Sequence, residues 1–404
     1  MTKVRTALVI GGGVAGPVAA MALRKAGIEA TVYESYPSTA DGIGGSLALA
    51  PNGQAALEVV GAREAVVAAA QPIHRSVLSF DGKEVAIPSL TGLPPLQLVH
   101  RADLHRALHG IAAERGIEIE HGKRLMAVEE TATGVTARFA DGTTATADIL
   151  IGADGIHSTV RTMIDPSAPG PGYTGALGFE AVVDRPVPSE PGSMCFAFGK
   201  RAYYLYWRRA DGRTGWGANL PQDEPMGLTE ARAVPAEEWL RRLRDAYGDD
   251  DPGGELIRHV GADQLQVTGS LHIMPSVPRW HRGRMVLVGD AVHAPSNSSG
   301  QGASLAIESA IELARCLRDL PDASTAFGAY ESSRRPRVER VAGRAAKINQ
   351  LKAPGRLTSA LMPMLMRLLM KTAMKPEKNF GPEQRYRIEW DTPLVSAPPA
   401  SVPD

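Results

Sequence analysis

Residues 3–34 read KVRTALVIGGGVAGPVAAMALRKAGIEATVYE, and this stretch decides the fold of the chain. Residues 3–10 are apolar and β-branched, which is typical of a buried strand, and the alanine-rich residues 14–26 favour a helix. A second strand follows at residues 30–34. A strand, a glycine turn, a helix and a second strand form a right-handed βαβ unit. The sequence therefore predicts an α/β fold that begins with a Rossmann-like unit.

The turn between the first strand and the helix carries the pattern G-x-G-x-x-G, at Gly11, Gly13 and Gly16. The first glycine permits a tight turn, the second lets backbone approach a pyrophosphate, and the third packs the helix against the strand. The helix N-terminus favours the negative charge of phosphates. The second strand ends at Glu34, whose carboxylate can accept hydrogen bonds from ribose hydroxyls. Because an acid there disfavours a 2′-phosphate, FAD and NAD remain as ligands of this unit; the alternative is a glycine turn with an incidental surface glutamate.

Length and charge restrict the remaining function classes. The chain has 404 residues, enough for two or three domains, and its 44 basic residues balance its 44 acidic ones. We expect a small-molecule partner and no nucleic acid, because no net charge attracts one. Cys195 and Cys316 make neither a disulfide framework nor a metal site. No stretch resembles a signal peptide or a membrane span, so we expect a cytoplasmic protein without stable membrane insertion.

The pattern of strands and helices predicts a nucleotide-binding domain in three parts, residues 1–72, 99–172 and 273–350. A hairpin at 73–98 and a β-sheet with a helix at 173–272 form a substrate domain interleaved between those parts. Within the third part we expect long helices over 302–320 and 323–351, the latter with Pro336 inside it. A C-terminal helix is expected over 351–390 and a disordered tail over 391–404.

Aromatic side chains gather in the predicted substrate domain, in a chain that is only 5% aromatic. Two interpretations stay open: these rings line a pocket, or they face the core of a packed sheet. A carboxylate substrate would need a cation in such a wall, and Arg201, Arg208 and Arg209 are available for that role or for solvent. The aromatic residues are Phe179, Phe196, Phe198, Tyr203, Tyr204, Tyr206, Trp207 and Trp216.

A second group of motif residues lies in MVLVGDAVHAPSNSSGQGASLAIESA, residues 285–310. Asp290 follows a strand, where its carboxylate can bind a ribitol hydroxyl. Gly300 and Gly302 open a helix whose N-terminus can stabilise negative charge on a reduced flavin ring. This pairing favours FAD over NAD.

Three stretches together, GGGVAGPVAA (11–20), GADGIHSTVR (152–161) and LVGDAVHAPSNSSGQGAS (287–304), resemble the FAD-dependent aromatic hydroxylases of the p-hydroxybenzoate hydroxylase type, the single-component flavoprotein monooxygenases. The likeness spans about residues 3–345. It implies that Asp154 and Arg161 serve both FAD and the reduced nicotinamide, and that Arg101 contacts FAD; a surface arginine is the alternative for Arg101. The full predicted set of cofactor-binding residues is Gly11, Gly13, Ala15, Gly16, Glu34, Gly45, Ser46, Arg101, Asp154, Arg161, Asp290, Pro295, Gly300, Gly302 and Ala303.

The chain departs from the family pattern at two positions, one of them beside the predicted flavin ring. Asn297 stands where the family usually has a proline, next to the carbon at which oxygen reacts, and Ser309 stands where an acid is common. Asn297 either alters the flavin chemistry or adds an amide donor. We predict Asn297 and His293 as catalytic residues. Among the histidines that could act as a general base, 74, 272 and 293, His293 lies nearest the cofactor motif, and a structural role is its alternative.

The activity that the resemblance implies is monooxygenation. NADPH or NADH would reduce FAD, O2 would add at the flavin C4a position, and the hydroperoxyflavin would hydroxylate an aromatic or polycyclic small molecule. A flavin dehydrogenase or oxidase that inserts no oxygen is a second hypothesis, kept open by Asn297. A third is a redox-silent FAD-binding scaffold or cyclase, because a fold does not fix a function. Substrate identity and oligomeric state are not fixed by the sequence.

Two late segments carry their own expectations. The Met-rich stretch at 357–374 is amphipathic, and we favour a packed helix that closes the domains over a membrane-contacting one. A basic run holds five arginines, and we expect a solvated helix face with ion pairs to Glu331 and Glu339. The arginines are Arg334, Arg335, Arg337, Arg340 and Arg344.

Overall fold

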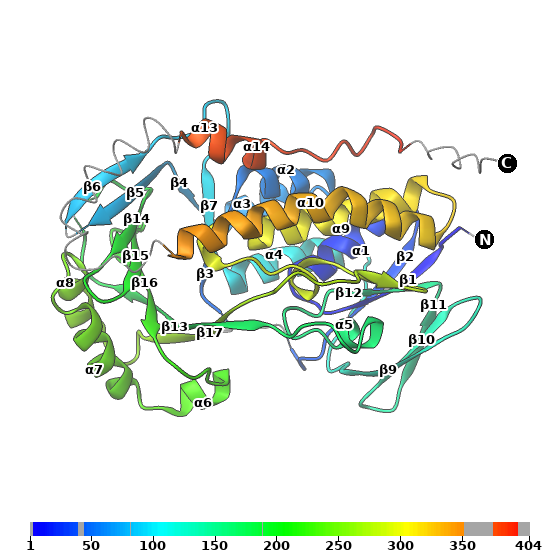
Figure 1. Ribbon diagram of the computed structural model, residues 1–404, viewed down its shortest axis with the longest axis horizontal. Coiled ribbons are helices and arrows are strands. Elements are labelled where there is room, and N and C mark those ends of the chain that lie inside the picture. The colour runs from blue at the N-terminus through cyan, green and yellow to red at the C-terminus, as the bar shows by residue number, and fades with distance from the viewer. Residues whose placement is uncertain (1–2, 39–43, 81, 188, 351–374, 395–404) are drawn as a thin grey trace.

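Two large β-sheets lie at opposite ends of the molecule, with helices between them (Figure 1). This arrangement comes from a computed structural model, which describes residues 3–38, 44–80, 82–187, 189–350 and 375–394. No described helix has the length and apolar character that a membrane span requires. The mixed α/β class, with a nucleotide-binding domain, an interleaved sheet domain and C-terminal helices, confirms the predicted fold class.

The first sheet has the strand order β18-β19-β12-β1-β2-β8 and is parallel except at β18. Its central strands are apolar along their whole length, because both faces are covered. The βαβ unit is present as predicted, with Gly11 at a φ of 107° in the turn. A Cβ built at Gly16 would collide with the Gly11 carbonyl, so α1 can approach β1 closely only with a glycine there. The elements are β1 (Thr6–Ile10), α1 (Ala15–Lys25), β2 (Glu29–Tyr33), β8 (Ile119–Glu120), β12 (Ile149–Gly152), β18 (His281–Arg282) and β19 (Met285–Leu287).

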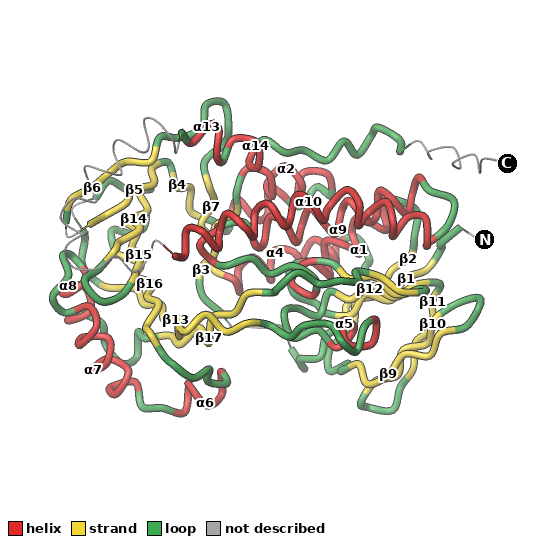
Figure 2. The backbone as a smooth tube through the Cα atoms, in the orientation of Figure 1, coloured by secondary structure: helices red, strands yellow, loops and turns green. Residues whose placement is uncertain are grey.

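Helices cover one side of this sheet and a small antiparallel sheet covers the other (Figure 2). On the second side, the ring of Tyr33 in β2 stacks on Phe139 of the small sheet at 4.7 Å between ring centroids. The small sheet comprises β9 (Leu125–Glu130), β10 (Val135–Phe139) and β11 (Thr144–Ala147), and α5 spans Thr159–Ile164. Besides α1, the helices are α2 (Pro51–Val59), α3 (Arg63–Ala68), α4 (Arg101–Glu114), α9 (Gly302–Asp319) and α10 (Ala323–Gln350), the last containing Pro336 as expected.

The second large sheet has the order β17-β13-β16-β15-β14-β5-β6. The early hairpin β5–β6 joins the later strands through a parallel pairing of β5 with β14, which is the interleaving that the sequence predicted. Residues 96–98 do not belong to that hairpin, however, because β7 pairs with β3 and β4 in a separate sheet. The strands are β3 (Ser46–Leu49), β4 (Gln71–Ile73), β5 (Arg75–Phe80), β6 (Lys83–Ile87), β7 (Leu96–His100), β13 (Gly172–Val183), β14 (Ser193–Phe198), β15 (Tyr203–Arg208), β16 (Thr214–Pro221) and β17 (Gln266–Ile273).

The aromatic residues of this sheet divide between its two faces. One set, which includes Tyr204 and Trp216, is buried against the helices α7 (Ala236–Tyr247) and α8 (Gly253–Arg258). The alternation of a strand places Phe196, Tyr203 and Trp207 on the other face. The packed-core interpretation therefore holds for the first face, and on the second face Trp207 is also buried, in a cluster with Ile73 and Leu98. Further short elements are α6 (Leu228–Ala233) and the 3₁₀ turns η1 (Gly289–Ala291) and η2 (Asn297–Ser299).

The basic run on α10 differs from expectation. Arg335 does pair with Glu331 and Glu339, as expected for a solvated face. Arg334 and Arg337 are instead buried, and both pair with the buried Glu308 of α9. The reason is that α10 packs against α9 along one side, so only part of the arginine run can reach solvent.

The chain after α10 also differs from a single helix followed by a disordered tail. Two one-turn helices, α13 (Pro376–Asn379) and α14 (Gly381–Gln384), precede an extended segment that runs across the helices (Figure 1). Trp390 is buried between Lys25 and Arg318, and the Leu394 amide donates to Asp319. These contacts give residues 391–394 a fixed place. The Met-rich stretch 357–374 lies outside the described residues.

Candidate active site

The glycine loop and Glu34 lie together, as the motif requires. One carboxylate oxygen of Glu34 accepts a hydrogen bond from the Gly12 amide at 2.6 Å, which joins the end of β2 to the loop. The nearest atom to a Cβ built at Gly13 is 4.0 Å away, so the backbone there is open to a ligand. On the other side of the loop, Nε2 of the buried His109 lies 2.7 Å from the Gly12 carbonyl oxygen. Ala15 is the first residue of α1, whose N-terminus faces this loop.

A second group forms around Asp290, at the 3₁₀ turn that follows β19. Burial raises the pKa of the Asp290 carboxyl, and the charge of the Arg101 guanidinium opposes that rise, so the two side chains share one site. The Arg101 amide donates to the Gly45 carbonyl at 3.2 Å, which brings Gly45 and Ser46 to the same place. Four predicted cofactor-binding residues from distant parts of the sequence therefore converge here.

The start of α9 is free of side-chain obstruction. Gly300 has a φ of 58°, in the left-handed region that favours glycine, and it ends the η2 turn. A Cβ built at Gly302 would meet no heavy atom within 4 Å, and Ala303 follows it in the first turn of α9. Pro295 and Asn297 precede this opening, and the Asn297 side chain is exposed. The helix terminus can thus be approached by an anionic or electron-rich group.

Asp154 and Arg161 have positions that favour support over direct ligand contact. The Asp154 carboxylate accepts hydrogen bonds from Ser158 Oγ and from the backbone amides of Thr159 and Val160, so it caps α5. Burial raises the pKa of Asp154, while these hydrogen bonds oppose the rise. Arg161 is only 3% exposed and donates to the Ala291 carbonyl at 2.9 Å. The geometry gives Arg161 the task of holding the turn that carries Asp290, whereas the resemblance implied contact with nucleotides.

His293 does not have the properties of a general base. It is 4% exposed, and its Nε2 lies 2.8 Å from Ser309 Oγ. Burial and the nearby charge of Arg334 lower its pKa to about 3. An imidazole with that pKa is neutral and has little affinity for a proton near pH 7. The position therefore favours the structural alternative. Of the other two histidines, His74 is exposed and Nδ1 of His272 lies 3.0 Å from the Ser270 carbonyl oxygen.

Sequence reasoning missed a buried network behind the start of α9. The Asn52 amide donates to Gln301 at 2.8 Å and to Glu308 at 2.7 Å, so it fixes the residue between Gly300 and Gly302. The sequence around Asn52 gives no signal for these partners, because they lie 249 and 256 positions away. Glu180 was also missed. It is a lone acid in the strand GYTGALGFEAVV, and its carboxylate contacts Ser46.

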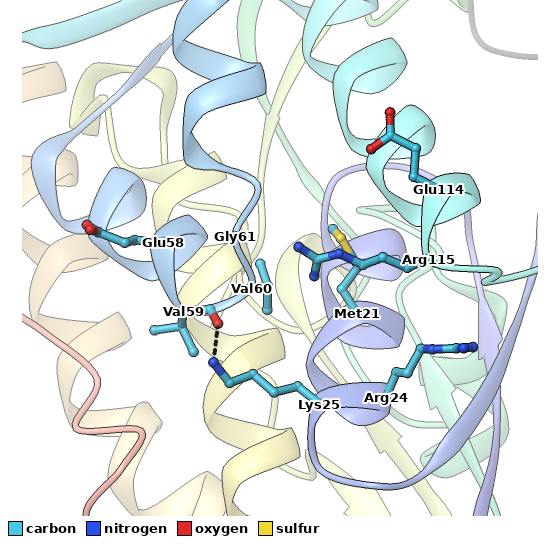
Figure 3. Close-up of a pocket in the computed structure, with 9 residues that line it drawn as sticks. All are labelled: Met21, Arg24, Lys25, Glu58, Val59, Val60, Gly61, Glu114 and Arg115. Carbon is cyan, nitrogen blue, oxygen red and sulfur yellow. Dashed lines mark hydrogen bonds between the residues drawn. The ribbon is translucent and has the colours of Figure 1, made fainter.

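The cavity drawn in Figure 3 has no part in this site. It measures roughly 650 Å³ and lies at the C-terminal ends of α1, α2 and α4, away from the glycine loop. Two of its cations are engaged with helix ends: Lys25 donates to the Val59 carbonyl, and Arg24 donates to the Gly116 carbonyl. Such contacts are the usual role of basic side chains at helix C-termini. The described residues hold no cluster of three or more His, Cys, Asp or Glu placed to bind a metal ion.

Comparison with known proteins agrees with this geometry. The family described as FAD binding domain matches residues 4–345. A 3-amino-4-hydroxybenzoate 2-monooxygenase of Streptomyces cremeus is 32% identical over 84% of this chain and 86% of its own. The FAD-dependent urate hydroxylase of Klebsiella pneumoniae is 31% identical over 84% of this chain and 88% of its own. The chain belongs to the FAD-dependent aromatic monooxygenases.

Solved structures of these flavoenzymes have the same architecture. Klebsiella pneumoniae HpxO in complex with FAD and uric acid aligns with a TM-score of 0.78 and 26% identity, over 90% of this chain and 92% of that one. The tetrameric form of 2-methyl-3-hydroxypyridine-5-carboxylic acid oxygenase aligns with a TM-score of 0.70 and 25% identity, over 89% and 96%. The residues of the present chain also fit FAD, because its backbone is open at Gly13 and Gly302 and acids lie at Glu34 and Asp290.

Proposed function

We propose that this flavoenzyme uses NADPH or NADH and O2 to hydroxylate an aromatic or polycyclic small molecule. One observation carries the proposal. Four predicted cofactor-binding residues converge beside the face of the seven-stranded sheet that lies opposite α7 and α8. They are Asp290, Arg101, Gly45 and Ser46. Two relatives are named for 3-amino-4-hydroxybenzoate and urate, both small ring compounds. A ring held between that sheet face and the cofactor residues would lie beside the flavin.

In this proposal, residues of the chain bind FAD, orient the substrate beside it and shield the substrate from water. Glu34 and the glycine loop hold the adenosine and pyrophosphate end of FAD, and Asp290 holds the ribitol end. The N-terminus of α9 stabilises negative charge on the flavin ring, and Gln301 keeps its place there through Asn52. The half-buried rings of the sheet face exclude water from the substrate. Bound FAD supplies hydride acceptance and the activation of O2.

The test is anaerobic mixing of the FAD-loaded protein with NADPH and, separately, with NADH, each with and without candidate aromatic compounds. Loss of flavin absorbance near about 450 nm, followed on aeration by label from ¹⁸O2 in the product, is the expected result. If neither nucleotide bleaches the flavin, with or without those compounds, the proposal fails. Bleaching of the flavin by an organic substrate alone, without nucleotide, would indicate a dehydrogenase or oxidase, the second hypothesis drawn from Asn297.

A further inference from the structure

The face of the seven-stranded sheet that turns toward the cofactor residues carries one acid, Glu180, together with apolar residues and with the amides Gln266 and Asn219. Register places Phe196, Leu205, Gly217 and Glu180 in one row across four adjacent strands. Phe196 and Leu205 are half-buried, whereas the aromatic residues of the opposite face are fully buried. Gly217 is buried, and a Cβ built on it would lie 3.2 Å from Leu205 Cδ1, so the Leu205 side chain covers Gly217 and forms the apolar part of the row beside Glu180. A flat ring could lie on this surface with its edge at the Glu180 carboxylate.

Glu180 also touches the loop that carries predicted flavin contacts. Its two carboxylate oxygens accept hydrogen bonds from the backbone amide and the hydroxyl of Ser46, each at 2.6 Å. The amide of Gln266, its neighbour on β17, donates to the Gly44 carbonyl at 3.0 Å. A Cβ built at Gly45 would collide with the Glu180 carboxylate. The acid therefore lies where the substrate-facing sheet meets the cofactor loop.

We propose that Glu180 recognises the substrate, and that it selects neutral or cationic aromatic compounds bearing an O–H or N–H donor over aromatic carboxylates. This inference rests on the proposed function. A carboxylate has about four acceptor positions, and Ser46 uses two of them, so Glu180 can hold Ser46 and a substrate donor together. With a phenol, the same carboxylate can take up the phenolic proton, leaving the electron pair on the phenol oxygen and making the ring more electron-rich.

The arginines that could have balanced a substrate carboxylate have other partners. Arg201 pairs with Asp249, and Arg209 pairs with Asp211. Arg208 donates to the Ser189 carbonyl at 3.1 Å. A substrate carboxylate placed beside this row would face the negative charge of Glu180, and like charges brought together in a partly desolvated site disfavour binding.

The test uses the FAD-loaded protein and three probes: resorcinol, which is neutral, tyramine, which is cationic, and 4-hydroxybenzoate, which is anionic. Binding is measured by perturbation of the flavin spectrum. We expect the wild type to bind resorcinol and tyramine more tightly than 4-hydroxybenzoate. In Glu180→Gln, the affinity for tyramine should fall about tenfold to a hundredfold, and the affinity for 4-hydroxybenzoate should rise. Glu84→Gln, on the edge strand β6 of the same sheet, should leave the three affinities unchanged.

A wild type that prefers 4-hydroxybenzoate, or an unchanged ratio of affinities in Glu180→Gln, would overturn the inference, and so would the absence of binding by all three probes. If Glu180→Gln fails to retain FAD, the same binding measurements are made on Glu180→Asp, which keeps the negative charge. This variant should still bind 4-hydroxybenzoate more weakly than the other two probes. Loss of that preference in Glu180→Asp would contradict the role proposed for Glu180. Because binding is read without turnover, this outcome is separate from the fate of the monooxygenase proposal, which ¹⁸O2 incorporation decides.

Discussion

A residue's place in a motif does not fix its chemistry, and His293 illustrates this. Its motif suggested a base beside the cofactor, but the fold surrounds the ring with Trp280, Ser309 and the charge of Arg334. Glu34 directly follows β2 and Asp290 lies in the turn after β19, because a strand and the residue that follows it are local features of the sequence. The environment of His293 comes from α9 and α10 and cannot be seen in the local sequence.

The low pKa of His293 predicts a specific pH dependence of stability. In the unfolded chain its imidazole has the ordinary pKa of 6.5, and in the folded protein about 3. As the pH falls below 6.5, the unfolded state takes up a proton that the folded state does not. The stabilisation is therefore complete above that pH and is lost on acidification, by about 1.4 kcal/mol per pH unit.

Urea unfolding between neutral and mildly acidic pH can isolate this effect. His293→Gln removes the titrating group, so its free energy of unfolding should fall less steeply on acidification than that of the wild type. His74→Gln serves as the control, because His74 is exposed. Equal slopes for wild type and His293→Gln would show that the folded protein binds the proton as readily as the unfolded one.

At the scale of the element, periodicity predicted where helices lie but not which face each one buries. The ranges of α1 and α9 agree with the expected helices within a few residues. The orientation of α10 could not be predicted, because five arginines in one run give no apolar stripe to mark the buried side. Contact with α9 decides it, and the arginines divide between a solvated and a buried face.

This division predicts unequal costs for two similar substitutions. Burial alone would raise the pKa of Glu308, yet Arg334 and Arg337, at 2.7 and 2.8 Å, hold it below its usual value. Glu308→Gln leaves two buried guanidiniums without a counter-charge and should cost about 3–5 kcal/mol. Glu339→Gln removes a half-exposed partner of Arg335 and should cost about 1 kcal/mol or less.

Chemical unfolding of the two variants side by side measures the difference. Both replacements are isosteric and both remove one negative charge, so net charge alone cannot separate them. Comparable destabilisation by Glu308→Gln and Glu339→Gln would mean that the buried pairs on α9 and α10 contribute no more than surface pairs.

At the scale of the whole molecule, the sequence predicted two interleaved domains but not how they meet. The contact runs through Ser46, Gly44 and the sheet residues Glu180 and Gln266, which lie more than 130 positions away. No local pattern pairs such distant segments. The C-terminal segment was likewise missed, because a helix was expected up to residue 390 and a disordered tail after it, whereas Trp390 is held by α1 and α9 and the Leu394 amide donates to Asp319.

The cofactor site and the C-terminal segment lie at opposite ends of the same two helices. Lys25 and Arg318, which contact Trp390, are near the C-termini of α1 and α9, whereas the glycine loop and Gly302 are at their N-termini. With about 1.5 Å of rise per residue, that separation is roughly 15 Å along α1 and 25 Å along α9. Stability and cofactor affinity should therefore respond to different substitutions.

Thermal unfolding with and without added FAD tests this separation. Trp390→Ala removes a large buried ring and should lower stability by about 3–5 kcal/mol, yet FAD should still raise its melting temperature as it does for the wild type. Asp290→Ala should lose most of that FAD-dependent rise, because stabilisation by a ligand depends on the ratio of its concentration to its Kd and vanishes when Kd is much the larger. If Trp390→Ala abolished the response to FAD, α1 and α9 would transmit changes along their length, and the two ends could not be treated as independent.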